Sequence, residues 1–105
     1  MRKEFEAFLL EKESFFEIEE IEREIVAKNE TSFAIDFMRK ERAGRVTLWE
    51  NGSLDLEIIC TESLRQELYQ HFSFREIPDF HYLLYPFFSV LLGKDLLPSY
   101  QKSWS

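Results

Sequence analysis

Few side chains in this sequence have the types and spacing that catalysis or metal binding requires. The chain has two histidines, His71 and His81, and one cysteine, Cys60. It has no glycine-rich phosphate loop, no His-Glu-x-x-His or Cys-x-x-Cys pair and no Gly-x-Ser-x-Gly motif. We expect both histidines to be partly exposed structural residues. The sequence therefore predicts no catalytic residue, no cofactor and no metal site, and it does not indicate an enzyme.

Acidic side chains are the second group that could carry a function. The chain has 20 acidic and 13 basic residues, for a net charge of −7, and ten of the acidic residues lie between Glu4 and Glu30. This charge opposes binding to nucleic acid or to an anionic membrane. The acidic segment is either a solvated face or a surface that attracts a basic partner. On the second interpretation, Glu20, Glu22 and Glu24 are candidate partner-binding residues.

The segment from Gly44 to Cys60 predicts a β-hairpin, because two alternating apolar runs meet at Asn51 and Gly52. A three-residue loop, with Gly52 in the left-handed conformation of a bulge, puts apolar residues opposite each other. This register pairs Leu48 with Leu54, Val46 with Leu56, and Gly44 with Ile58. One face of the hairpin is then core, and Cys60 lies on that face as a free thiol.

The opposite face of the hairpin is polar around a tryptophan. The same register pairs Trp49 with Ser53, Thr47 with Asp55, and Arg45 with Glu57. Trp49 is either covered by the C-terminal tail or exposed as an anchor for a partner, a role in which Trp is over-represented. The candidate partner-binding residues of this face are Trp49, Thr47, Asp55 and Glu57.

The N-terminal third predicts a helix followed by a strand. Residues 2–13 have the spacing of an amphipathic helix. We favour a strand over residues 18–28, because Ser14 and the Phe15-Phe16 pair can end the helix, although the apolar spacing also fits a continued helix. As a strand, one face would carry Ile21, Arg23, Ile25 and Ala27, and the other Glu20, Glu22, Glu24 and Val26.

Two further strands flank the hairpin. Residues 31–38 alternate between apolar and other side chains and predict a strand, followed by a charged loop over residues 39–43. Residues 66–74 suggest a fifth strand, with a helix over residues 62–72 that begins at Thr61 as the alternative.

A helix closes the predicted fold. It begins near Pro78 and ends at Gly93, and it is apolar almost all round, so we expect it to be well buried, with a kink at Pro86. Residues 94–105 have no regular period and are expected to pack partly over the sheet or the helix and then fray.

These elements predict one α+β domain over residues 1–105. An antiparallel sheet of four to five strands would carry the N-terminal and C-terminal helices packed on one face. The other face and the sheet edges would then be offered to a partner. The sequence has no apolar region typical of a signal peptide and no apolar stretch long enough to span a membrane, so we expect a cytoplasmic protein.

Residues 44–63 resemble the central hairpin of the TriTu family of bacterial immunity proteins, and the order of elements is similar to that family. The resemblance rests on Leu48, Trp49, Asn51, Gly52, Asp55, Leu56 and Glu57. It implies a protein that forms a heterodimer with a cognate toxin of the Rhs polymorphic type, an ADP-ribosyltransferase that modifies elongation factor Tu. The immunity protein would neutralise this toxin by occluding its active site.

A secretion chaperone or adaptor, which would also be small and acidic, is the alternative from another class. It would hold an effector protein unfolded instead of blocking an active site. The neighbouring gene discriminates the two hypotheses. A toxin-like domain encoded immediately upstream favours the immunity protein, and a secreted effector beside secretion-machinery genes favours the chaperone.

Overall fold

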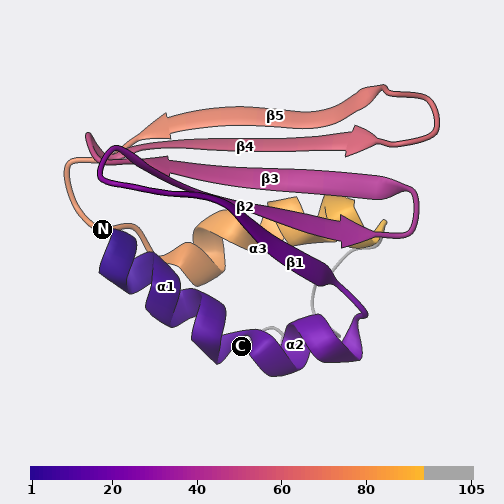
Figure 1. Ribbon diagram of the computed structural model, residues 1–105, viewed down its shortest axis with the longest axis horizontal. Helices are drawn as coiled ribbons and strands as arrows, with labels where there is room; N and C mark the ends of the chain where they lie inside the picture. Colours follow the sequence, from indigo (N-terminus) through magenta and orange to yellow (C-terminus); the bar gives the residue numbers. More distant parts are fainter. Residues whose placement is uncertain (94–105) are drawn as a thin grey trace.

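The computed structural model describes residues 1–93, which form a five-stranded antiparallel sheet and three helices (Figure 1). In chain order the elements are α1 (Arg2–Glu11), α2 (Glu13–Ile18), β1 (Glu22–Lys28), β2 (Ser32–Arg39), β3 (Arg42–Trp49), β4 (Ser53–Cys60), β5 (Gln66–Ser73) and α3 (Phe80–Leu92). The strands lie in the sheet in the same order as in the chain. Figure 1 shows the helices gathered on one side of the sheet. The predicted α+β class and the fifth strand are thereby confirmed.

The core lies between the helices and the sheet and is built largely of phenylalanine. Phe16 of α2, Phe37 of β2, and Phe87 and Phe88 of α3 are all fully buried. Phe88 has its ring centroid 5.0 Å from that of Phe37 and 5.5 Å from that of Phe16. Tilted and edge-to-face ring pairs of this kind add to the energy of burial. The contacts lock the helices onto one face and leave the other face of the sheet uncovered by them.

The hairpin of β3 and β4 has the predicted register. Leu48 is paired with Leu54, Val46 with Leu56, Gly44 with Ile58, Thr47 with Asp55, and Arg45 with Glu57. The loop closes as expected, because Gly52 has φ +87° and its N–H donates to the carbonyl oxygen of Trp49 at 3.0 Å. The pairing ends at Leu48 and Leu54, so Trp49 and Ser53 lie at the mouth of the loop.

The N-terminal segment differs from its prediction. The first helix ends at Glu11, and a second helix, α2, contains Ser14, Phe15 and Phe16, which we expected to end the helix. The physical reason is packing. The rings of Phe15 and Phe16 are both buried against Phe88, and a helical turn is what points them there together. Residues 13–18 are therefore helical, but as a separate short helix and not as a continuation of α1, and the strand begins only at Glu22.

Two details of β1 and β2 also differ. The register of β1 shifts at Val26, so Ala27 lies opposite Ala34 and not on the face of Arg23 and Ile25 as expected. The charged loop predicted over residues 39–43 is a tight turn of two residues, because β2 continues through Arg39 and β3 begins at Arg42. Lys40 makes this turn with φ +54°.

The closing helix α3 begins with a side-chain cap. The carboxylate of Asp79 accepts hydrogen bonds from the backbone N–H groups of His81 and Tyr82, and Pro78 lies just before this cap. The helix ends at Gly93 in a left-handed conformation, as predicted. The helix is well buried as expected along one side, through Phe80, Leu84, Phe87, Phe88, Leu91 and Leu92, whereas Tyr82 on another side is 83% exposed. The predicted tail, residues 94–105, lies outside the described residues.

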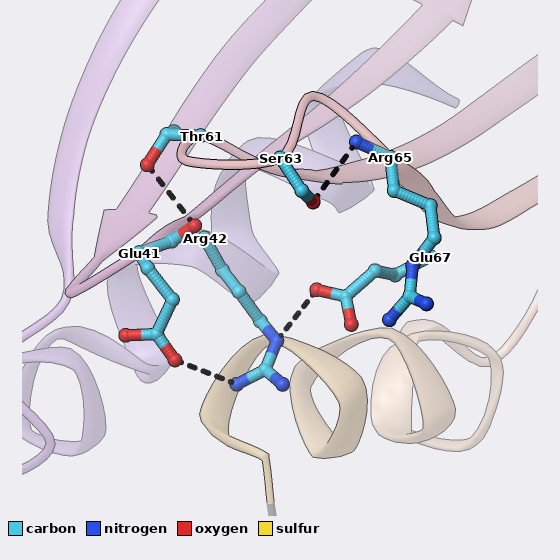
Figure 2. A network of polar contacts seen from close by, with 6 residues as sticks. All are labelled: Glu41, Arg42, Thr61, Ser63, Arg65 and Glu67. Atoms are coloured by element: carbon cyan, nitrogen blue, oxygen red, sulfur yellow. Dashed lines mark hydrogen bonds and ion pairs between the residues drawn. The ribbon is translucent and has the colours of Figure 1, made fainter.

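A polar network joins the turn between β2 and β3 to the turn between β4 and β5 and to β5 (Figure 2). Arg42 of β3 donates from Nε to Glu67 Oε1 of β5 at 2.9 Å, across the end of β4, and its Nη1 lies 3.7 Å from a carboxylate oxygen of Glu41. Thr61 donates to the carbonyl oxygen of Glu41 at 3.1 Å, in the turn where a competing helix was considered. Ion pairs of Arg42 with Glu41 and Glu67 therefore link β3 and β5 at this end of the sheet. Cys60, at the end of β4, is only partly buried.

Candidate protein-binding face

The face of the sheet away from the helices is the candidate site, and it is called the open face below. Side chains alternate between the two faces of a strand. The residues of the open face are therefore those that alternate, in the observed strand register, with the buried residues of the core face. They are Glu22, Glu24 and Ala27 of β1; Ser32, Ala34, Asp36 and Met38 of β2; Ala43, Arg45, Thr47 and Trp49 of β3; Ser53, Asp55, Glu57 and Ile59 of β4; and Gln66, Tyr69, His71 and Ser73 of β5.

Asp55 lies at the centre of the hydrogen bonding on this face. Its Oδ2 accepts from Trp49 Nε1 at 2.9 Å, and its Oδ1 lies 2.5 Å from His71 Nδ1. Burial by itself would raise the pKa of Asp55, but the hydrogen bonds from His71 and Trp49 outweigh it and hold that pKa below its usual range. The carboxylate is therefore kept ionised between two aromatic rings.

A row of charged side chains crosses the strands beside Asp55. Arg45 donates from Nε and Nη2 to the two carboxylate oxygens of Asp36, at 2.6 and 3.0 Å, and this bidentate contact raises the pKa of Arg45. Glu57 accepts a hydrogen bond of 2.7 Å from Gln66, and Glu24 lies opposite Asp36. The open face carries five carboxylates and one guanidinium, so its potential is negative.

The structure brings six of the seven candidate partner-binding residues onto this face. Trp49, Thr47, Asp55, Glu57, Glu22 and Glu24 share it, spread over β1, β3 and β4. Trp49 is 40% exposed. Glu20 is separate. It lies in the turn between α2 and β1 with φ +57°, where it lines a hollow of about 470 Å³ together with Glu22.

Sequence reasoning missed part of the site. His71 was given no partner, and the structure corrects this, because its ring meets the carboxylate of Asp55. The alternation of residues 66–74 was sufficient to predict on which face of the sheet His71 lies. It did not predict that His71 lies opposite Asp55. The pair of Asp36 and Arg45 was also missed. His81 lies in the helical layer, with its ring edge-on to Phe8 at 5.1 Å and its Nε2 3.7 Å from Glu11.

The chemistry of the open face is that of noncovalent recognition, with carboxylate acceptors and partly exposed aromatic rings. Within residues 1–93, no three or more His, Cys, Asp or Glu side chains are grouped so that they could hold a metal ion. None of the helices α1, α2 and α3 is long and apolar enough to cross a membrane.

Comparison with protein families decides what kind of protein carries this face. The model of the immunity protein TriTu matches residues 3–90. The chain belongs to the TriTu immunity protein family. The match spans the five strands and most of α3, so it extends the resemblance of the central hairpin to nearly the whole described fold. No curated protein shows significant similarity to the chain. Membership of an immunity-protein family assigns an antitoxin role, with a cognate toxin as the partner.

Proposed function

We propose that this TriTu immunity protein neutralises an NAD-dependent ADP-ribosyltransferase toxin of the Rhs polymorphic type. The toxin would modify elongation factor Tu, and the immunity protein would bind it in the cytoplasm as a heterodimer, with the open face laid over the toxin's active site. The observation that supports this proposal best is the open face itself. It is negatively charged, lies away from the helices and presents the partly exposed indole of Trp49.

Charge supports this choice of partner. A toxin that uses NAD must bind an anionic cofactor, and basic groups around its cleft serve that purpose. Glu22, Glu24 and Glu57 are exposed on the open face, whereas Asp36 is engaged with Arg45. Exposed carboxylates opposite a basic cleft would accelerate association and disfavour partners of the wrong charge.

Rigidity supports the use of the open face as an inhibitory surface. The face is built on five paired strands whose other side is packed against a phenylalanine core. A surface held in this way loses little conformational freedom on binding, so more of the contact energy is available as affinity. Trp49, at the end of β3, would serve as the main anchor, since Trp is enriched among residues that dominate binding energy.

The test uses the toxin domain encoded by the gene beside that of the immunity protein. We expect one molecule of the immunity protein per toxin to stop ADP-ribosylation of elongation factor Tu and to displace a fluorescent NAD analogue from the toxin. Trp49→Ala should weaken both effects, and Tyr82→Ala, an exposed aromatic on α3, should weaken neither. A complex that forms but still binds the NAD analogue would rule out occlusion of the active site. Binding of only an unfolded effector would support the chaperone hypothesis.

A further inference from the structure

Asp55 joins two aromatic side chains that come from different strands. Trp49 ends β3, Asp55 is on β4, and His71 is on β5 directly opposite Asp55. One carboxylate oxygen accepts from the indole and the other contacts the imidazole. The side chain of Asp55 is 30% exposed and that of His71 is 50% exposed, so the carboxylate is more buried than the ring it contacts.

This arrangement restrains an indole that is 40% exposed at the mouth of a loop. Hydrogen bonds to an ionised acceptor are shorter and stronger than those between neutral groups. A large side chain that is already held in one rotamer loses less entropy when a partner covers it. The effect on a complex is mainly on its lifetime, because affinity differences within one interface are expressed chiefly in dissociation.

We propose that Asp55, itself steadied by its contact with His71, is a positioning residue that holds the indole of Trp49 in place and thereby sets how long the toxin stays bound. The inference rests on the proposed function, because the toxin is the partner whose dissociation is affected. Asp55 acts through the indole. Its replacement should therefore matter only while the ring of Trp49 is present.

A double-mutant cycle tests this dependence. Asp55→Ala should speed dissociation of the toxin about tenfold in the wild-type background and less than about twofold in the Trp49→Ala background. Asp55→Asn should recover part of the loss, since its amide oxygen still accepts from the indole. Glu57→Ala is the matched control, because Glu57 contacts Gln66 and neither ring. Its effect should add to that of Trp49→Ala without coupling.

A measurement on the free protein makes the result independent of the toxin. The indole N–H signal of Trp49 in a two-dimensional NMR spectrum, assigned with Trp104→Phe, should move and broaden in Asp55→Ala and stay in place in Glu57→Ala. Circular dichroism confirms that each variant is folded. An unmoved indole signal in Asp55→Ala, or equal effects of Asp55→Ala with and without the ring of Trp49, would overturn the positioning role. Failure of the wild-type protein to bind the toxin would instead overturn the proposed function.

Discussion

Gly44 lies directly against the ring of Phe87, so closely that a Cβ atom at this glycine would come 2.6 Å from Phe87 Cζ. Gly44 is on the core face of β3, and Phe87 is fully buried in α3. The contact brings the helix close to the middle of the sheet. It leaves no space for a side chain at this position of β3.

Gly44→Ala should therefore lower the free energy of unfolding by about 1 to 3 kcal/mol, as overpacking of a core does. The ring of Phe87 is fully buried and packs against Phe37 and Phe88, so those rings would have to shift with it. Urea denaturation followed by circular dichroism measures the change. Ala43→Ser, at the neighbouring position on the open face, is the control and should change little. Equal midpoints for Gly44→Ala and the wild type would show that the two elements do not pack this closely.

Gly52→Val should destabilise the protein by about 1 to 3 kcal/mol, for backbone reasons as well as steric ones. Gly52 has φ +87°, which a β-branched residue adopts only under strain, and an added Cβ would lie 2.7 Å from the carbonyl oxygen of Phe74. Thermal melting measures the loss. Glu50→Val places the same side chain in the same loop without a positive φ and should be tolerated. Similar melting temperatures for the two variants would remove the assignment of the turn.

Trp49→Ala should speed dissociation of the toxin by about 30-fold or more, the expectation for a residue that dominates an interface. Surface plasmon resonance separates this from a change in association. Tyr82→Ala removes an aromatic ring that is even more exposed, but from the helical layer, and it should leave the kinetics unaltered. If Tyr82→Ala and not Trp49→Ala shortens the lifetime of the complex, the helices and not the open face bind the toxin.

Replacing Glu20, Glu22 and Glu24 together with Gln should slow association and flatten its dependence on salt, because exposed charges act mainly on the encounter. Glu11, Glu13 and Glu17, replaced in the same way, are the control, since they are also exposed but lie on the helices. Association rates at two salt concentrations measure the effect. Equal slowing by both triple variants would mean that only net charge matters and not its place on the molecule.

The lowered pKa of Asp55 predicts how stability responds to acid. A carboxyl group whose pKa is lower in the folded state contributes stability above its unfolded pKa, about 3.9, and that contribution is lost as the pH falls through the folded value. Asp55→Asn should therefore lose less stability than the wild type between about pH 5 and pH 2. Trp49→Phe, which removes one of the two hydrogen-bond donors, should fall in between. Parallel acid-denaturation curves for all three proteins would contradict the role given to these hydrogen bonds.

The sequence was most informative where two independent signals agreed. In the hairpin, the alternation of Val46 and Leu48 with Leu54 and Leu56, together with Gly52, left one register in which both strands bury their apolar sides. The same register puts the four candidate partner-binding residues of the hairpin together on the opposite face, so the amino-acid sequence is sufficient to predict their grouping. The local pattern was sufficient to predict this register because the two paired strands, β3 and β4, are adjacent in the chain.

The rest depended on contacts between distant segments. Phe15 and Phe16 read as helix breakers by propensity, but burial against Phe88 of α3 favours the helix. The pairing of His71 with Asp55 required the register of β5 against β4, which residues 61–65 do not reveal. The register shift at Val26 could not be predicted from the alternation of apolar and polar residues in β1, because nearly all residues of this strand are exposed.

The order of the strands has a consequence for how the chain folds. Because each strand pairs with the one before it in the chain, the sheet β1-β2-β3-β4-β5 is assembled entirely from hairpins of neighbouring segments. Short closures of this kind cost little chain entropy and favour rapid folding. Helix α3 covers the middle of the sheet and is the last of the described elements. During synthesis the sheet can form early, but the part of its apolar side that α3 covers stays exposed until residues 80–92 have left the ribosome, so chains truncated before Phe80 should aggregate.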